Sequence, residues 1–243
     1  MPEETTPFTQ GPGSQPVSKT VGVLGGMGPD ATADLMSRVI RATPAEKDQD
    51  HLRMLVDNNP HVPNRQEALL RGGEDPGPAL ASMARGLAAA GADFLVMPCN
   101  TAHAFADAIT AAVDIPLVSI IDVTVEACGD ATAIGVLATD GCITSGEFQA
   151  ALAGRGKQAV LPDEAETRTL MSLITRIKAG DTGAEVADGM RDLAGALVAR
   201  GAELIIAGCT EIPLVLDADR VDVPLVSSTD ALARATVAMA RSA

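Results

Sequence analysis

Short apolar runs alternate with longer alanine-rich stretches along most of this chain. The runs are apolar at successive positions, which indicates strands buried on both faces, whereas the longer stretches repeat their apolar residues at helical spacing. The pattern predicts strands at residues 20–24, 52–57, 94–97, 117–119, 133–137, 158–161, 204–207 and 225–227. It predicts helices at residues 29–41, 76–90, 102–112, 121–128, 145–153, 164–178, 183–200 and 229–241.

Strands that alternate with helices are typical of βαβ units on parallel sheets. The pattern therefore predicts an α/β fold with doubly wound parallel sheets. In such sheets, ligands bind beyond the carboxyl ends of the strands. Candidate functional residues are expected where a predicted strand gives way to a helix.

The sequence also contains an internal repeat. Residues 87–99 (LAAAGADFLVMPC) match residues 197–209 (LVARGAELIIAGC) at an offset of 110. Two further pairs of segments repeat in the same order along the chain. GVL at 22–24, before the first pair, recurs at 135–137, and VDIPLVS at 113–119, after it, recurs as VDVPLVS at 221–227. The repeat indicates two pseudo-symmetric domains that arose by duplication, with the active site in the cleft between them.

The repeat also suggests where the domains begin and end. We expect a disordered tail at residues 1–18, because this stretch is polar and rich in Pro, Gly, Thr and Gln. The first α/β domain is predicted to comprise residues 19–119 together with the last helix, residues 228–243. Residues 120–227 are predicted to form the second α/β domain. Cys99 and Cys209, which end the two repeated segments, then lie on opposite sides of the shared cleft.

Composition narrows the range of partners. Aromatic residues make up 2% of the chain, with no Trp or Tyr, and the formal net charge is −14. This charge opposes binding to nucleic acid or to an anionic membrane surface. The sequence has no apolar run near the ~20 residues of a membrane span and no apolar signal segment at its start. We therefore expect a cytoplasmic protein whose cysteines are reduced.

Two thiols that face each other across a cleft are suited to removing a proton from one face of a carbon atom and returning one to the other. A thiol of pKa ~8.5 needs help to act as a base at neutral pH, and the first turn of a helix lowers a thiol pKa. We expect Cys99 and Cys209 each to begin such a turn, capped by the polar side chains that follow them. Cys128, inside a predicted helix, is interpreted as structural.

Three motifs carry a resemblance to a known family. GGMGPDAT (25–32), PCNTAH (98–103) and GCTEIPL (208–214) together resemble the cofactor-independent aspartate/glutamate racemases, above all the aspartate racemase branch. The resemblance implies that Cys99 and Cys209 form a catalytic thiolate/thiol pair. It also implies no cofactor, neither pyridoxal phosphate nor a metal, and a homodimer that acts on a small acidic amino acid.

Several residues are candidates for binding that substrate. The glycine-rich turn around Met27 offers backbone N–H groups for a carboxylate. By resemblance, Arg65 and Lys178 bind the two carboxylates of aspartate; the two cations are 113 positions apart, the offset of the GVL pair. The candidate polar contacts are Asn100, Thr101, Thr139 and Thr210, and Glu211 is placed to accept or relay a proton from Cys209. His103 is interpreted as a helix residue.

Two positions depart from the family pattern. Cys142 stands where relatives usually have Thr, and Phe148 where they often have Tyr. The first change replaces a good hydroxyl donor with a weak thiol near the expected carboxylate site. It either tunes the substrate, with a third thiol in the cleft, or is a tolerated replacement.

Other functions remain open at this point. Hydantoin racemase chemistry would leave Arg65 or Lys178 without a carboxylate partner, and an arylmalonate-type decarboxylase needs one catalytic cysteine. Maleate isomerisation would use a cysteine as a nucleophile toward an alkene. A ligand-binding descendant without turnover would have no need for two thiols.

Overall fold

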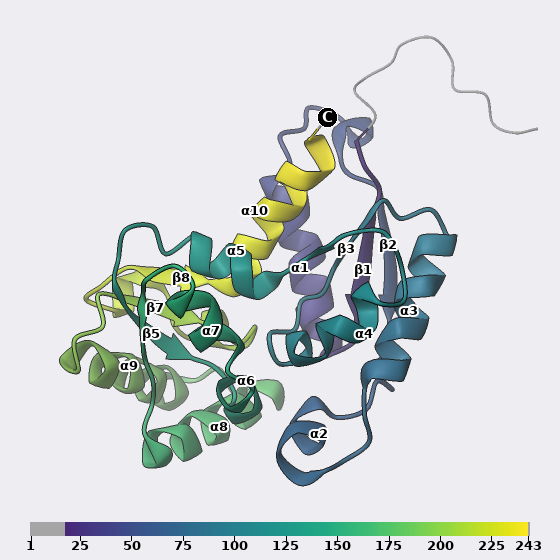
Figure 1. Cartoon of the computed structure of the whole chain (residues 1–243). Helices are drawn as coiled ribbons and strands as arrows, with labels where there is room; N and C mark the ends of the chain where they lie inside the picture. Colours follow the sequence, from purple (N-terminus) through teal and green to yellow (C-terminus); the bar gives the residue numbers. More distant parts are fainter. Residues whose placement is uncertain (1–17, 243) are drawn as a thin grey trace, which may run out of the picture.

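The computed structural model describes residues 18–242 and contains two four-stranded parallel sheets (Figure 1). The first sheet has the order β2-β1-β3-β4 and the second β6-β5-β7-β8. The strands are β1 Val21–Gly25, β2 Met54–Asn58, β3 Phe94–Val96, β4 Leu117–Val118, β5 Ala133–Leu137, β6 Gln158–Val160, β7 Leu204–Ala207 and β8 Leu225–Ser227. The α/β fold expected from the sequence is confirmed. Residues 1–17 of the predicted tail lie outside the described residues.

The sequence repeat corresponds to equivalent strand contacts in the two sheets. Gly22 of β1 lies beside Leu95 of β3, and Gly135 of β5 lies beside Ile205 of β7. A Cβ at Gly22 would lie 2.7 Å from the Leu95 side chain, and one at Gly135 would overlap the Ile205 side chain. Each GVL segment therefore needs its glycine because the large residue of the repeated strand fills the space beside it.

Helices cover both sheets. The longer ones are α1 Pro29–Ala42, α3 Gly77–Ala89, α8 Glu164–Lys178, α9 Ala184–Ala199 and α10 Ser228–Arg241. The shorter ones are α2 Arg65–Arg71, α4 Ala106–Thr110, α5 Ile120–Glu126, α6 Asp140–Ser145 and α7 Glu147–Ala153, with 3-10 helices η1 Asp48–Asp50, η2 Thr101–Phe105, η3 Ile212–Leu214 and η4 Ala218–Arg220. No helix in residues 18–242 is long and apolar enough to cross a membrane.

The structure corrects three helix predictions. The single helix expected at residues 102–112 is η2 followed by α4. The helix expected at 145–153 is preceded by an additional one: α6 ends at Ser145, the next residue Gly146 has a left-handed φ of 77°, and α7 begins directly after it. The helix α2 was not predicted, because none of its residues is buried and it therefore lacks an apolar stripe.

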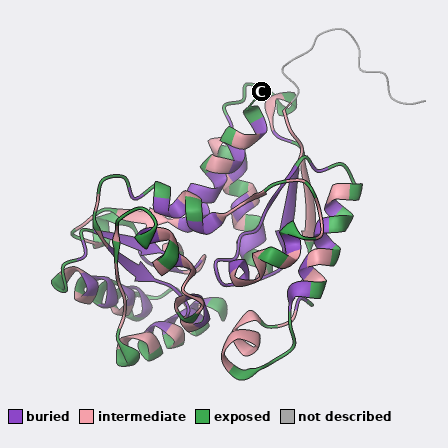
Figure 2. Cartoon of the chain, in the orientation of Figure 1, coloured by how far each residue is buried: buried purple, intermediate pink, exposed green. Residues whose placement is uncertain are grey.

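One hydrophobic cluster extends through both halves of the molecule. It contains Val23 and Val96 of the first sheet, Val136 of the second, Ile121 of α5 and Leu232 of α10. Helix α10 packs against both α1 and α5, and α5 also packs against α7 (Figure 1). The buried residues in Figure 2 accordingly continue from one sheet into the other. Because this apolar region links the two halves, the boundaries of the two domains stay a prediction.

Candidate active site

A pocket of about 150 Å³ lies beyond the carboxyl ends of β1, β3, β5 and β7. In both sheets these are the two central strands, where the order of the strands reverses and ligands of α/β proteins bind. Every residue proposed from the sequence as catalytic or substrate-binding lines this pocket. They are Met27, Arg65, Cys99, Asn100, Thr101, Thr139, Lys178, Cys209, Thr210 and Glu211. Their roles remain predictions, although the structure brings all of them together.

Cys99 follows β3 and is 9% exposed. The buried side chain of His103 lies behind it, with Nδ1 2.9 Å from the Cys99 carbonyl oxygen. The His103 Nε2 accepts a hydrogen bond from the Ile120 N–H at 3.1 Å, so the proton of the neutral ring is on Nδ1, which donates to Cys99. Burial lowers the pKa of His103 to about 4. His103 therefore does more than occupy a helix: it ties the Cys99 backbone to the start of α5.

Cys209 follows β7 and donates from Sγ to Glu211 Oε2 at 2.9 Å. Thr210 Oγ1 donates to the same oxygen at 3.0 Å, and Lys178 Nζ lies 3.5 Å from Oε1. Burial, and then the charge of Glu211, raise the pKa of Cys209 well above its ordinary value. The expectation that a helical turn favours the thiolate is therefore wrong for Cys209, because desolvation and a nearby carboxylate outweigh any helix dipole.

The turns after the two cysteines also differ from the expected capped helices. Each cysteine precedes a short 3-10 helix, η2 or η3, and neither helix has a side-chain cap. The Asn100 amide instead donates to Ser228 Oγ of α10 at 3.1 Å, and its Oδ1 is buried without a partner. The hydroxyls of Thr101 and Thr139 lie 2.9 Å apart and join the two halves beside the pocket.

The two cations reach the pocket from opposite halves. Arg65 is the first residue of α2, and its Nη1 donates to the carbonyls of Val62 at 3.1 Å and Pro63 at 3.0 Å. Its Nε is buried without a partner. Lys178 is the last residue of α8, is about half exposed and is paired with Glu211. The loop carbonyls thus orient Arg65, which lines the pocket.

The glycine-rich turn offers fewer backbone N–H groups to a ligand than the sequence suggested. Gly26 has a φ of 94°, and a Cβ there would overlap the Asn59 backbone, so glycine is required. Its N–H donates a hydrogen bond to Thr32 Oγ1 at 2.9 Å and is therefore not available for a substrate. Met27 is the residue of this turn that lines the pocket.

Cys142 lies away from the pocket surface. It is fully buried in the apolar cluster together with Phe148 and does not line the pocket. Burial raises its pKa to about 12. The idea of a third thiol in the cleft is therefore wrong, because this thiol lies in the core. Cys128 is also buried, and donates to the Thr124 carbonyl.

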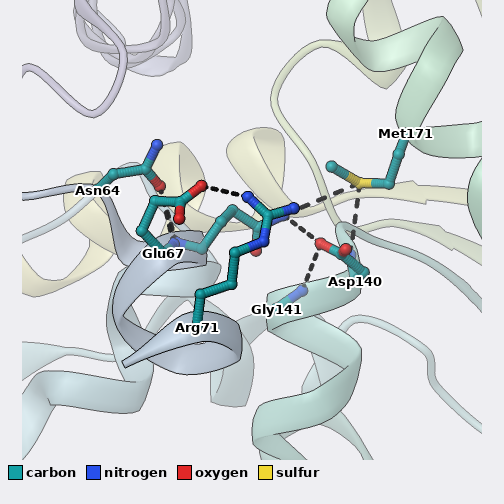
Figure 3. A network of polar contacts seen from close by, with 7 residues as sticks. Asn64, Glu67, Arg71, Asp140, Gly141 and Met171 are labelled. Atoms are coloured by element: carbon teal, nitrogen blue, oxygen red, sulfur yellow. Dashed lines mark hydrogen bonds and ion pairs between the residues drawn. The ribbon is translucent and has the colours of Figure 1, made fainter. Parts of the chain in front are cut away.

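Part of the pocket lining was not predicted from the sequence. The additional residues are Asn64, Gln66, Met171, Ile174, Thr175 and Gly208. Gln66 makes a contact that links the halves: its Nε2 donates to Asp140 Oδ1 and lies 3.9 Å from Met171 Sδ. The side chains around this contact are drawn in Figure 3. Within residues 18–242, no group of three or more His, Cys, Asp or Glu is arranged to hold a metal ion.

The fold and pocket define a two-lobed α/β protein in which each half contributes one cysteine to a shared cavity. Residues 24–236 match the model of the Asp/Glu/hydantoin racemase family, and the chain belongs to this family. It is therefore an enzyme of the racemase class of isomerases.

Two relatives resemble the chain over nearly its whole length. The broad-specificity amino-acid racemase RacX of Bacillus subtilis (strain 168) is 28% identical over 89% of this chain and 96% of its own. The structure of the Picrophilus torridus aspartate racemase is 28% identical, covers 91% of this chain and 94% of that one, and superposes with a TM-score of 0.82. A glutamate racemase from Francisella tularensis, 17% identical over 91% of this chain and 80% of its own, has a TM-score of 0.66 and shares the fold.

Proposed function

We propose that the protein interconverts the L and D forms of aspartate, or of a similar acidic amino acid, without a cofactor. Cys99 and Cys209 act as the two proton-transfer groups at Cα. The observation that carries this proposal is that one pocket is lined by two cysteines from equivalent strand ends and by two cations. One thiol on each face of Cα allows a proton to leave on one side and to be added on the other.

The protonation of Cys209 indicates how a reaction starts. Burial and the hydrogen bond to Glu211 favour the protonated thiol of Cys209 in the free protein. Cys209 is therefore ready to give a proton, and Cys99 takes the proton from the enantiomer whose Cα–H faces it. After that turnover the roles are reversed, and the reverse reaction starts from Cys209 as base.

Arg65 and Lys178 bind the carboxylates of the substrate and stabilise the negative charge that develops on it. Removal of the α-proton moves negative charge onto the carboxylate, and preorganised donors near that charge lower the barrier. Arg65 and Lys178 both line the pocket, and Lys178 exchanges its contact with Glu211 for one with a substrate carboxylate. A bidentate guanidinium–carboxylate pair would make Lys a poor replacement for Arg65.

The size and polarity of the pocket support a small substrate. Pockets for drug-sized ligands measure about 300–1,000 Å³, whereas this one is about 150 Å³. The name of the Bacillus relative suggests a broader amino-acid range, and that of the Picrophilus relative aspartate. We favour an acidic amino acid because the lining contains both Arg65 and Lys178.

Proton NMR in D₂O tests the proposal. Purified protein with reduced thiols is mixed with L-aspartate, L-glutamate or L-alanine without added cofactor, and chiral chromatography measures the D form in the same tubes. We expect the α-proton signal of aspartate to disappear as D-aspartate accumulates. Absence of exchange with all three would overturn the proposal and direct the search to hydantoins and maleate.

The cysteine pair makes a further prediction. Cys99→Ala and Cys209→Ala should each reduce racemisation of aspartate by at least about 10²-fold, since general acid–base groups contribute about 10²–10⁴-fold. Cys128→Ala, which removes a buried thiol outside the pocket, is the matched control and should keep activity. Full racemisation by either pocket variant would contradict the two-base scheme.

A further inference from the structure

Helix α2 carries Arg65 but is weakly anchored to its own half. None of its seven residues is buried, and Figure 2 shows them as intermediate or exposed. The helix packs on α6 of the second half and on η2 of the first. In Figure 1 it lies apart from the first sheet, on the side where α6 and α8 are found. The carbonyls of Val62 and Pro63 hold the Arg65 guanidinium, whereas the placement of the helix that carries it depends largely on contacts across the cleft.

The side chain of Gln66, next to Arg65, provides the most specific of these contacts. Its Nε2 donates to Asp140 Oδ1 at the start of α6 and lies 3.9 Å from Met171 Sδ of α8. The α-carbon of Gly141 faces the other end of the amide, because a Cβ added there would overlap Gln66 Oε1. Three residues of the second half thus surround one amide group.

Contacts within the second half also hold the partners of Gln66 in place. Asp140 Oδ1 also accepts the Gly141 N–H at 2.8 Å, and the Asp140 N–H lies 3.5 Å from Met171 Sδ (Figure 3). The carboxylate is therefore fixed at the start of α6, and a hydrogen bond to a charged group is stronger than one between neutral groups.

The other polar contacts of α2 stay within its own half. Asn64 Oδ1 caps the helix by accepting from the N–H groups of Gln66 at 2.9 Å and Glu67 at 3.3 Å. Arg71 pairs with Glu67 on the exposed face (Figure 3). These contacts support the helix itself but do not place it against the second half.

We propose that Gln66 is a positioning residue, whose contact with Asp140 fixes α2 across the cleft and so places the Arg65 guanidinium toward the substrate carboxylate. The assignment rests on the proposed function for the identity of the substrate. The contact between the halves itself does not depend on which substrate is bound.

The carboxylate that Arg65 meets is charged before as well as during proton transfer, so loss of this contact should weaken substrate binding more than it slows chemistry. A hydrogen bond to a charged group contributes more than one between neutral groups, and a tenfold change in an equilibrium constant corresponds to about 1.4 kcal/mol. We expect Gln66→Ala and Asp140→Ala each to raise KM for aspartate about tenfold while kcat changes less than about threefold.

Two further variants separate positioning from general damage. Gly141→Ala should displace the Gln66 amide by steric overlap while favouring α6, because alanine is the better helix former. It should raise KM in the same way. Gln66→Glu combined with Asp140→Asn exchanges donor and acceptor within the same contact, and should bring KM back to within about threefold of wild type. Gln66→Glu alone places two carboxylates together and should be the most defective.

Arg71→Ala is the matched control. It lies on the same helix, and its side chain is 69% exposed and paired with Glu67. Its KM should equal that of wild type. Unchanged KM in Gln66→Ala, or no recovery in the exchanged pair relative to the single variants, would overturn the proposal.

Hydrogen exchange of backbone amides tests the contact without a measurement of enzyme activity. Amides of residues 65–71 should exchange faster in Gln66→Ala than in wild type or in Arg71→Ala, with the strands unchanged. Equal exchange would contradict the proposal even if wild type racemised no amino acid, so failure of the proposed function and failure of this inference are distinguishable. Should Gln66→Ala unfold, Gln66→Met keeps the volume and removes the amide.

Discussion

The side chains of Cys209 and Glu211 are in contact, as expected for a carboxylate that accepts or relays the proton of the thiol. The expected helical turn at the cysteine suggested a lowered pKa for its thiol, whereas burial and the carboxylate raise it. Proximity in sequence indicated that Glu211 is near the thiol. It did not show that Glu211 Oε2 would be the acceptor for both Cys209 and Thr210 while Oε1 faces Lys178.

Removal of the Glu211 charge should change the pH dependence of activity. The nearby negative charge disfavours the thiolate, so in Glu211→Gln the pKa of Cys209 should fall. The limb of the kcat/KM profile that reports Cys209 as base should then move to lower pH. Profiles measured from L- and from D-aspartate identify the affected direction, because Cys209 is the base in one of them. A limb that stays in place or moves to higher pH would contradict this.

Most individual site residues could be found from the sequence, and the reason is topological. Residues at the carboxyl ends of parallel strands meet at one edge, so the repeat and the motifs brought Cys99, Thr139 and Cys209 to one pocket. Gln66 and Met171 could not be found in this way. They meet across the cleft although 105 positions separate them in the chain, and neither belongs to a motif.

At the scale of elements, buried strands were the easiest to predict and small surface helices the hardest. The strands read as continuous apolar runs because helices cover both faces of each sheet. Helix α2 gave no such signal, since its stability comes from the Asn64 cap and its position from polar contacts across the cleft. The break at Gly146 similarly depends on a left-handed residue between two short helices.

The contact of His103 with two elements makes stability depend on pH. Its folded-state pKa is about 4, below the unfolded value of 6.5, so the unfolded chain binds the proton first as pH falls. The contribution is complete above the unfolded pKa and is lost as pH falls toward the folded one. The shift corresponds to about 3 kcal/mol, at 1.36 kcal/mol per pKa unit.

Urea unfolding at a series of pH values between 7 and 4 measures this contribution. His103→Gln, which cannot titrate, should show a smaller loss of unfolding free energy than wild type by about 3 kcal/mol over this range. His61→Gln removes an exposed imidazole and should follow wild type. Parallel curves for wild type and His103→Gln would show that His103 is not the responsible group.

At the scale of the whole molecule, the shared apolar cluster predicts a single unfolding transition. It joins both sheets through α5 and α10, so unfolding of one half exposes apolar residues of the other. Calorimetry should give equal calorimetric and van't Hoff enthalpies. Leu232→Ala in α10, a fully buried site, should lower stability by about 2–5 kcal/mol and shift the whole transition. Two separated transitions would contradict this prediction.

The crossed arrangement of α5 and α10 has a consequence for recombination. Helix α5 leaves the first sheet and packs on α7, whereas α10 leaves the second sheet and packs on α1; the two helices also pack on each other. A chimaera that takes one half from a relative therefore inherits a foreign surface on at least one of these helices, wherever the crossover is placed. Exchange of halves between family members requires the α5–α10 pair to be transferred as a unit together with the surfaces of α1 and α7.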